Sequence, residues 1–531
     1  MKRITIYDTT LRDGMQGVGV NYSLRDKLLI TEKLDDIGID YIEGGFPLAS
    51  DKEAAFFSEA QKLRLKHARI CAFGSTRKPG KKTDQDPHMQ ALLAAETPSV
   101  TLVGKAWIDH VSQVLETTPE ENLAMIFDSI QYLVSRGKEV IFDLEHFFDG
   151  YKQNKAYTLE VLQAASQAGS SCLVLCDTNG GCLFNEVTEI LHELPQDLAA
   201  PFGVHFHDDT GMAVANSLAG VLAGATHVQG TVNGWGERCG NMNLCTFIPD
   251  LVLKTTYKTG VNNHLEKLTT LSRFVAEIAN IIPDKRQPYV GEAAFSHKAG
   301  QHADVIAKAP SLMEHIDASQ VGNRRKIILS ELAGKSTIIK KLSRYGRFDK
   351  DSQVVSSLIT TLKERETAGY EYEAAEASFD ILVRKSLDLY TPLLELNNYH
   401  LESYKTWEIP SKTIGRIFLQ SHGKQIMGAG VGIGPVETLD AALRDALTPF
   451  HSFIKNISLT DYKVRVLEPE RAAAAKVRVF ITSTDHTRSW DTVGVNQNII
   501  EASWEAIIDS FEYYYNNFVL IGGDQSINQD K

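Results

Sequence analysis

The chain has 531 residues, 43% of them hydrophobic, and carries 55 Lys and Arg against 67 Asp and Glu, a formal net charge of -12. This length exceeds one ordinary core, so we expect two or three domains. The acidic balance and the absence of a long basic run argue against nucleic-acid or anionic-membrane binding and favour small-molecule chemistry. No window approaches a signal peptide or a membrane span of roughly 20 apolar residues, so we expect a cytoplasmic protein.

Short β-branched runs alternate with longer amphipathic stretches through residues 1–265. The predicted strands are RITIYDTT, DYIEGG, ARICAFGS, SVTLVGKA, EVIFDLE, CLVLCD, FGVHFHD and THVQGTV. Helical patterns lie between them, such as SLRDKLLITEKLDDIG, with Ser23 as the expected N-cap and Gly38 as the stop. Strands separated by helices imply parallel pairing, and eight of them within about 250 residues favour an α/β fold of the (β/α)8 TIM barrel type over an open doubly wound sheet.

Polar residues gather at the carboxyl ends of these strands, where barrel enzymes carry their chemistry. Charged groups in such a ring need partners or a metal ion, because an uncompensated buried charge costs several kcal/mol. The residues in question are Asp8, Arg12, Asp13, Glu43, Asp143, Glu145, Asp177, Thr178, Asn179, His205, His207, Asp208, Asn233, Glu237, Arg238 and Asn241.

Two histidines stand one residue apart in GVHFHDDTG. In a strand, His205 and His207 point to the same face. A lone histidine on an apolar strand is more often a hydrogen-bonded core residue than a ligand, and that interpretation stays open here. In a closed barrel, however, the first strand lies near the last ones, so Asp13 can converge with the pair and Asn241 can add an oxygen. The alternative to core histidines is therefore a catalytic metal site.

The ion at such a site is a divalent metal. Two imidazoles with oxygen ligands accept zinc, manganese or, less readily, magnesium. The carboxylates that follow the pair, Asp208 and Asp209, are expected to orient the imidazoles rather than to bind the ion.

After residue 265 the pattern changes twice. Residues 266–377 are expected to form helical linker subdomains, and residues 378–520 a further α/β domain, followed by a tail at 521–531. In the further domain we predict strands at FDILVRKSLDLY and WEIPSKTIGRIFLQS, with GAGVGIGPVETLDAALRDALTPF entering a helix. A similar strand, turn and helix recur in KVRVFITSTDHTRSWDTVGVNQNIIEASWEAIIDSFEYY, which predicts an internal duplication.

Two other motifs are given structural interpretations. GAGVGIGP lacks the spacing of a dinucleotide-binding loop and is predicted to be a turn packed between strand and helix. The cysteines lack paired metal-finger spacing, so we expect six reduced thiols and no disulfide.

Several of these segments carry a family resemblance. YDTTLRDGMQ, HFHDDTGMAVANSLAGVLAGA and NGWGERCGNMNL closely resemble signatures of the α-isopropylmalate, homocitrate and citramalate synthases, metal-dependent barrel enzymes that condense acetyl-CoA with a 2-oxo acid. The resemblance continues through FSHKAGQHAD, EHIDASQVGNRRKIILSELAGKS and the duplicated domain, so it covers nearly the whole chain.

Within this family, EHFFDGYKQN and LCDTNGG look most like the citramalate branch, whose oxo acid is pyruvate and whose product leads to isoleucine. The 2-isopropylmalate synthases, which use 2-oxoisovalerate, and the homocitrate synthases remain alternatives. Pyruvate and 2-oxoisovalerate differ only by methyl groups, and a binding pocket distinguishes two substrates by only about 1 to 3 kcal/mol per methylene. The choice of oxo acid therefore stays open at this point.

The resemblance implies a role for each matching residue. His302, in AGQHAD, matches a histidine proposed in the family to help deprotonate acetyl-CoA, and Arg12 matches the arginine that polarises the keto group. Glu145 matches an acidic active-site residue of the family, and Thr178 matches the residue that binds the carboxylate of the oxo acid. The family's metal ligands match Asp13, His205, His207 and Asn241.

One position departs from the family pattern. Met313 stands just before EHI, where the family often has a tyrosine that belongs to the acid-base relay. A thioether cannot transfer a proton, so that step has no assigned residue.

The duplicated domain resembles the effector domain of these synthases, which implies a homodimer inhibited by an end-product amino acid, isoleucine. Two other classes of function fit the sequence less well. Cys239 resembles the catalytic cysteine of hydroxymethylglutaryl-CoA lyases, but these lack the duplicated domain. A catalytically silent amino-acid sensor is disfavoured because the whole set of site residues is present.

Overall fold

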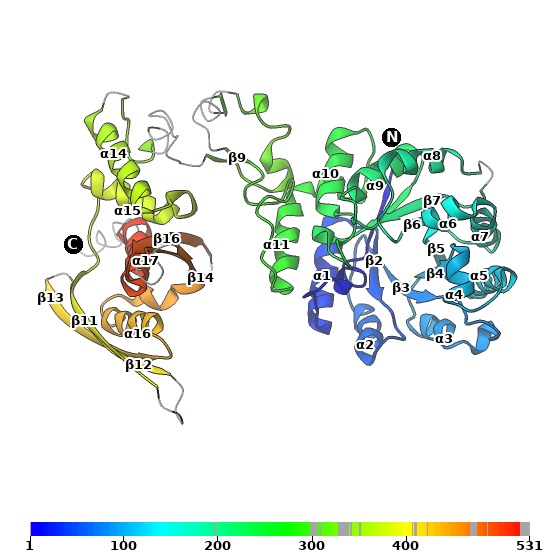
Figure 1. Ribbon diagram of the computed structural model, residues 1–531, viewed down its shortest axis with the longest axis horizontal. Helices are drawn as coiled ribbons and strands as arrows, with labels where there is room; N and C mark the ends of the chain where they lie inside the picture. Colours follow the sequence, from blue (N-terminus) through cyan, green and yellow to red (C-terminus); the bar gives the residue numbers. More distant parts are fainter. Residues whose placement is uncertain are drawn as a thin grey trace, which may run out of the picture. The chain divides into compact units, whose positions relative to one another are not determined.

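The computed structural model describes residues 2–195, 198–297, 305–306, 309–327, 339, 342–349, 352–405, 407, 411–421, 423–467, 475–485 and 487–520. The chain forms two compact units (Figure 1). One unit comprises Met1–Ser296 with Glu314–Lys326, and the other comprises His297–Met313 with Ile327–Lys531.

The first unit is built on a closed barrel of strands β1 to β8, paired in sequence order. All neighbouring strands run parallel, and the barrel closes where Thr5–Asp8 pairs with His227–Gly230. This confirms the predicted (β/α)8 barrel. The strands are β1 (Thr5–Asp8), β2 (Tyr41–Gly45), β3 (Arg69–Ser75), β4 (Ser99–Lys105), β5 (Glu139–Glu145), β6 (Cys172–Asp177), β7 (Phe202–Phe206) and β8 (His227–Gly230).

Helices surround the barrel (Figure 1). The first begins and ends as its sequence predicts: the Ser23 hydroxyl accepts a hydrogen bond from the Asp26 N–H, and Gly38 adopts φ 90°, a left-handed conformation that suits glycine. The helices are α1 (Leu24–Ile37), α2 (Asp51–Ala60), α3 (Pro87–Ala94), α4 (Ile108–Gln113), α5 (Pro119–Val134), α6 (Phe147–Gln153), α7 (Lys155–Gln167), α8 (Phe184–His192), α9 (Ala213–Leu222), α10 (Leu244–Lys254) and α11 (Leu268–Ile278).

The barrel has two kinds of interior. Between strands and helices lies a large apolar core, to which each strand contributes the side chains of its outward face. Inside the barrel is a smaller cluster of mixed character, which includes Tyr7, Cys71, Ile141, Cys172, Val174 and Cys176. The ring of His227 lies 5.1 Å from that of Tyr7, centroid to centroid. Buried polar side chains are therefore part of the barrel's filling.

The second unit confirms the predicted duplication. Two three-stranded antiparallel sheets, β11-β12-β13 and β14-β15-β16, are each followed by a helix, α16 and α17 (Figure 1). The elements are β11 (Glu395–Tyr404), β12 (Lys412–Ser421), β13 (Lys424–Gly432), α16 (Pro435–Leu447), β14 (Ser458–Val466), β15 (Val477–Thr484), β16 (Ser489–Asn496) and α17 (Ile499–Tyr514). Helices α14 (Gln353–Ala368) and α15 (Glu376–Ser386) precede them, while the short strands β9 (Ser296–His297) and β10 (Lys326–Ile327) lie where the chain passes between units.

One predicted strand is wrong. FDILVRKSLDLY begins inside helix α15 rather than forming a strand. A short apolar run does not distinguish a strand from a buried helix, and here the helical spacing prevails. Arg384 donates to the Asp380 carboxylate four residues earlier at 2.8 Å, and Phe379 and Val383 are buried on the same helix.

The predicted turn at GAGVGIGP is also wrong in part, because Gly428, Gly430 and Gly432 belong to strand β13. A Cβ at Gly428 would lie 2.1 Å from the Ala442 carbonyl oxygen, and one at Gly430 would lie 2.3 Å from that of Thr438. The alternating glycines therefore let helix α16 approach the strand backbone directly.

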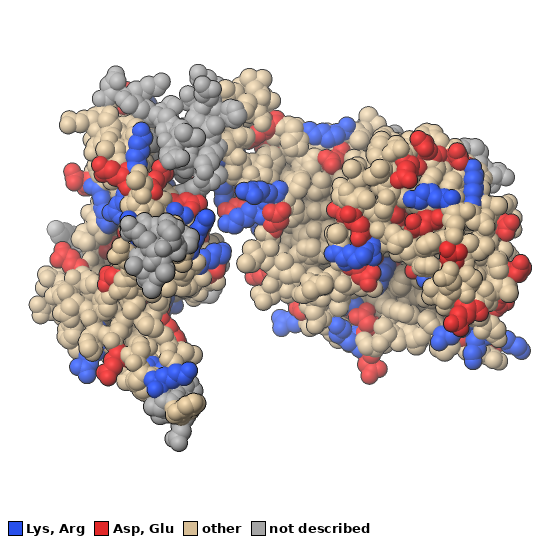
Figure 2. All heavy atoms as spheres, viewed as in Figure 1, with Lys and Arg blue, Asp and Glu red and all other residues tan. Residues whose placement is uncertain are grey.

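All six cysteines are free thiols, and Cys239 is exposed whereas the others are buried. None of the helices in the described part of the chain has the length and apolar character needed to cross a membrane. Acidic and basic side chains are interspersed over the visible face of the first unit (Figure 2).

Replacing Gly430 by valine should destabilise the second unit, because the new side chain would overlap the backbone of α16. We expect a loss of about 1 to 3 kcal/mol, the usual cost of overpacking. Calorimetric melting of the full chain measures it. Ala429→Val is the matched control, since Ala429 is exposed on the opposite face of the same strand. Equal stability of both variants would contradict this packing.

Burial of His227 lowers the pKa of its imidazole from 6.5 to about 3. Between these values the unfolded chain binds one more proton than the folded chain, so stability is lost as pH falls from about 6.5 towards 3, by up to about 1.4 kcal/mol per pH unit. His227→Gln should make the wild-type dependence of unfolding free energy on pH less steep between 6.5 and 4, and His207, with its lowered pKa, should account for part of the slope that remains. His192→Gln, at an exposed position, should leave it unchanged.

Candidate active site

The site lies at the carboxyl end of the barrel strands. His205 is in β7 and His207 just beyond it, so the strand's alternation points both rings to one side, with centroids 5.1 Å apart. Asp13, in the loop after β1, joins them across the barrel closure. The ligand atoms of all three lie within 4.8 Å of one another, and all three residues are buried. Within the described residues this is the only such group of His, Cys, Asp or Glu.

The hydrogen bonding of this group is incomplete. Three side-chain atoms, Asp13 Oδ1, His207 Nδ1 and Asn241 Oδ1, are buried without a hydrogen-bond partner among the described residues. Asn241 donates its Nδ2–H to the Trp235 carbonyl at 3.1 Å, and its backbone forms a bridge with His207. Leaving such atoms unpaired is costly, whereas a divalent ion accepts carboxylate, imidazole and amide donors. The donor set therefore fits a metal ion.

The charges of the group also suit a metal. Burial alone would raise the pKa of Asp13, but the Arg12 guanidinium and the two imidazoles hold the pKa below its usual value. Burial, with the neighbouring His205, lowers the pKa of His207 to about 4. Near neutral pH the site thus offers a carboxylate and a neutral imidazole, the protonation states that metal binding requires.

Arg12 supplies a fixed positive charge beside the group. Its Nε donates to Glu43 Oε2 at 2.6 Å, and its guanidinium lies 3.4 Å from Asp13 Oδ2 and 3.9 Å from the centre of the Phe73 ring. Burial opposes the charged form, but Glu43 and Asp13 outweigh it and raise the pKa of Arg12. Tyr7 donates its hydroxyl to the other Glu43 oxygen at 2.9 Å, so the guanidinium is held in one orientation.

Two further predicted residues lie on neighbouring strands. Glu145 ends β5 and forms an ion pair with Lys105, which ends β4 in register with it. Thr178 follows β6, and its hydroxyl oxygen accepts the His146 N–H at 2.9 Å. Lys105 is absent from the sequence prediction, although its place at the end of a barrel strand is the same signal that identified Glu145.

The expected role of the two carboxylates after the histidines is wrong, since their hydrogen bonds go elsewhere. Asp208 Oδ1 accepts from the Ala213 N–H at 2.9 Å at the start of α9. Asp209 accepts two hydrogen bonds from Arg238, at 2.8 and 2.9 Å, and Arg238 also donates to the Thr178 carbonyl. These carboxylates order the loops around the site.

A different side chain contacts the imidazole of His205. Its Nδ1 lies 2.8 Å from Gln229 Oε1, and Gln229 Nε2 donates to Asp143 Oδ1 at 2.9 Å. Gln229, in β8, was missed because a glutamine in an apolar strand is not distinctive in sequence.

Two predicted residues are not among those that the structure brings together at the barrel site. His302 is outside the described residues. Met313 follows the short 3-10 turn Pro310–Leu312 and belongs to the second unit.

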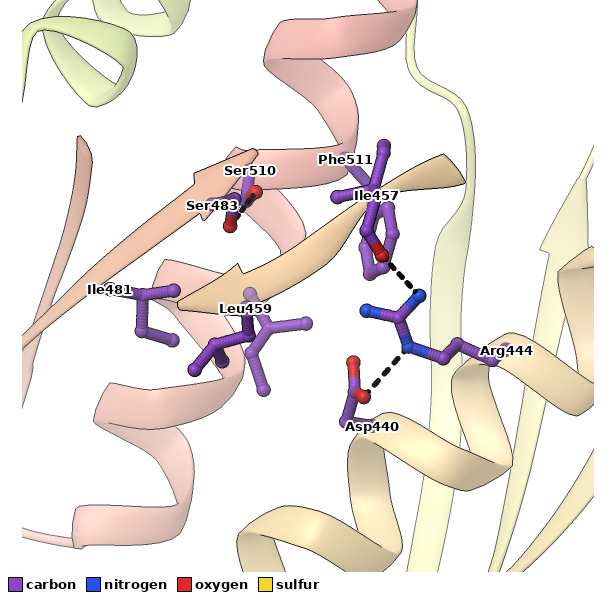
Figure 3. Close-up of a pocket in the computed structure, with 9 residues that line it drawn as sticks. Asp440, Arg444, Ile457, Leu459, Ile481, Ser483, Ser510 and Phe511 are labelled. Atoms are coloured by element: carbon purple, nitrogen blue, oxygen red, sulfur yellow. Dashed lines mark hydrogen bonds and ion pairs between the residues drawn. The ribbon is translucent and has the colours of Figure 1, made fainter. Parts of the chain in front are cut away.

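The second unit has a small pocket, partly open to solvent, between α16, α17, β14 and β15, with room for about one water molecule (Figure 3). Arg444 donates to the Asp440 carboxylate at 2.7 Å and to the Ile457 carbonyl at 2.7 Å, and the Ser510 hydroxyl donates to that of Ser483 at 2.7 Å. The pocket thus combines a charge pair and two hydroxyls with an apolar lining of Ile457, Leu459, Ile481, Ile507 and Phe511.

Three family models match successive parts of the chain. Residues 3–275 match the HMGL-like model, residues 289–368 the homocitrate synthase post-HMGL domain-like model, and residues 373–515 the LeuA allosteric (dimerisation) domain. The barrel and its buried Asp-His-His group therefore belong to the HMGL-like family, joined here to a LeuA-type domain.

Curated relatives resolve the family further. The (R)-citramalate synthase of Aquifex aeolicus is 48% identical over 96% of this chain and 98% of its own length, and that of Synechocystis sp. is 45% identical over 96% and 95%. A probable 2-isopropylmalate synthase of Methanopyrus kandleri is 30% identical over 95% and 97%. The chain belongs to the (R)-citramalate synthase family.

Proposed function

We propose that the chain is a cytoplasmic acyltransferase of isoleucine biosynthesis that condenses acetyl-CoA with pyruvate and hydrolyses the thioester, giving (R)-citramalate and CoA. The observation that carries the proposal is the buried group of Asp13, His205 and His207 beside Arg12 at the barrel mouth. Identity of 48% to an (R)-citramalate synthase, against 30% to a probable 2-isopropylmalate synthase, favours pyruvate as the acceptor.

We assign Asp13, His205, His207 and Asn241 as the residues that hold a divalent ion. When bound, such an ion supplies a Lewis acid for the keto oxygen of the oxo acid. Two imidazoles with oxygen donors favour zinc or manganese over magnesium. In the same proposal, residues 1–265 are catalytic, 266–377 form the linker, and 378–520 are regulatory.

Arg12 and Thr178 act on different parts of the oxo acid. The Arg12 guanidinium, held by Glu43, stabilises the negative charge that develops on the keto oxygen as the new carbon-carbon bond forms. The Thr178 hydroxyl accepts from the His146 N–H, so its own proton can be donated to the oxo acid's carboxylate.

A base must remove a proton from the acetyl methyl group before the enolate carbon attacks the keto carbon. We assign this step to His302, and we assign Glu145 as the acidic residue of the active site. Lys105 forms an ion pair with Glu145, and the carboxylate has further lone pairs that can accept a hydrogen bond. Water then cleaves the thioester and releases CoA.

Asp13→Ala and His205→Ala should each lower kcat by at least about 10³-fold, the equivalent of roughly 4 kcal/mol of barrier, because each removes a metal donor. Thiol release from acetyl-CoA with a panel of 2-oxo acids, with and without chelator, measures this together with the metal content of each variant. Glu32→Ala, which removes an exposed carboxylate on α1, is the control. Near wild-type turnover in a variant would contradict the assignment of the altered residue to the metal site. Highest activity with 2-oxoisovalerate would contradict pyruvate as the acceptor.

We further propose that the second unit forms a homodimer and binds isoleucine as an inhibitor. The pocket of Figure 3 carries the Asp440–Arg444 ion pair beside branched apolar side chains. In this proposal the ion pair separates and the pocket widens, so that the two charged residues bind the charged ends of the amino acid and the apolar lining binds its side chain. The matched LeuA allosteric (dimerisation) model supports this assignment.

Leu459→Trp should fill the pocket and raise the isoleucine concentration for half-inhibition at least tenfold without changing kcat. Val464→Trp is the matched control, because Val464 lies on the same strand with similar exposure, 42% against 38%, and does not line the pocket. Unchanged inhibition in Leu459→Trp, measured by CoA release, would place the effector elsewhere.

A further inference from the structure

The barrel contains a buried hydrogen-bond network that joins Asp143 on β5, through Gln229 on β8, to His205 on β7. Gln229 is fully buried, and the exposed fractions of Asp143 and His205 are 4% and 5%. Buried polar groups are nearly always hydrogen-bonded, so this network constrains the orientation of each of its side chains.

Asp143 fixes the orientation of the Gln229 amide. Gln229 Nε2 donates to Asp143 Oδ1 at 2.9 Å, and this oxygen can accept whether the carboxyl group is ionised or carries its proton on Oδ2. The amide oxygen then faces His205 Nδ1, at 2.8 Å. Because an oxygen without a proton can only accept, Nδ1 must carry the imidazole proton.

The tautomer of His205 follows. With its proton on Nδ1, the imidazole presents an unprotonated Nε2, and this is the atom that lies 3.5 Å from Asp13 Oδ2. The opposite tautomer would place a hydrogen on Nε2, where it would block coordination. Partners on the far side of a ligating imidazole commonly set its tautomer and basicity.

We propose that Gln229 is a positioning residue that, oriented by Asp143, locks His205 in the tautomer with a free Nε2 and so prepares it as a metal ligand. The inference deepens the proposed function, since it rests on His205 being one of the metal-binding residues. Gln229 hydrogen-bonds to His205 and Asp143, so in this proposal it acts on the ion through His205.

The first test is metal affinity, measured on purified, metal-free protein by competition of Zn²⁺ and Mn²⁺ with a chromogenic chelator. Gln229→Leu, which removes the acceptor, should bind the ion about 10 to 100 times more weakly. Gln229→Glu keeps an oxygen that accepts from Nδ1–H, and a proton shared between the new carboxyl group and Asp143 replaces the lost N–H donor. This variant should stay within about threefold of wild type. Asn216→Leu removes another buried amide, which donates to the Cys182 carbonyl, and should leave affinity unchanged.

The second test reads the tautomer directly, by NMR of ¹⁵N-labelled imidazoles in the metal-free protein, with the His205 signals identified by their loss in His205→Ala. We expect a protonated Nδ1 and an unprotonated Nε2 in wild type and in Gln229→Glu, and a mixture in Gln229→Leu. A wild-type proton on Nε2 would overturn the proposal; it is the result expected if Asp143 carried a proton and reversed the amide.

The two readouts separate this inference from the proposed function. Unchanged affinity in Gln229→Leu, or equal weakening in the leucine and glutamate variants, would overturn the role of Gln229 even if the enzyme makes citramalate. If the oxo-acid panel instead contradicted pyruvate, the affinities and the tautomer would still decide the role of Gln229.

Discussion

The pairing of β1 with β8 is the contact on which the candidate site depends. Thr5–Asp8 hydrogen-bonds to His227–Gly230, which closes the sheet and brings the loop after the first strand beside the last two strands. In an open sheet, Asp13 and His205 would stand near opposite edges, and no ion could bridge them. Closure also gathers all eight carboxyl ends into one ring, so residues from β2, β4, β5 and β6 surround the same small volume.

The buried charged side chains at the carboxyl ends of the strands need partners of opposite charge. Arg12 is held by Glu43, and Lys105 by Glu145, so each cation has a specific carboxylate. The exception is the group at Asp13, where donor atoms converge without enough hydrogen bonds to satisfy them. Single unpaired polar atoms, such as His227 Nε2, also occur elsewhere in the described barrel, but at Asp13 they come together with the imidazoles that could hold an ion. This clustering indicates where a ligand contributes the missing interactions.

Much of the barrel fold could be predicted from the sequence because it follows from strong local patterns. The eight strands, the cap at Ser23 and the barrel closure follow from periodicity and capping chemistry. The family resemblance is confirmed by the curated relatives. The error at FDILVRKSLDLY arose because an apolar run of this length fits either period. Gln229 could not be predicted, since its meaning depends on side chains from two other strands, and a hydrogen-bond partner in space leaves no mark on spacing.

The glycines of β13 have a mechanical consequence. Where side chains separate a helix from a sheet, the two can slide as rotamers adjust. Gly428 and Gly430 remove that layer, and α16 rests on the strand's own backbone. Helix and sheet must therefore move as one rigid body. Since Asp440 and Arg444 lie on the same helix and line the pocket, anything that wedges this helix aside there tilts the whole β11-β12-β13 sheet with it.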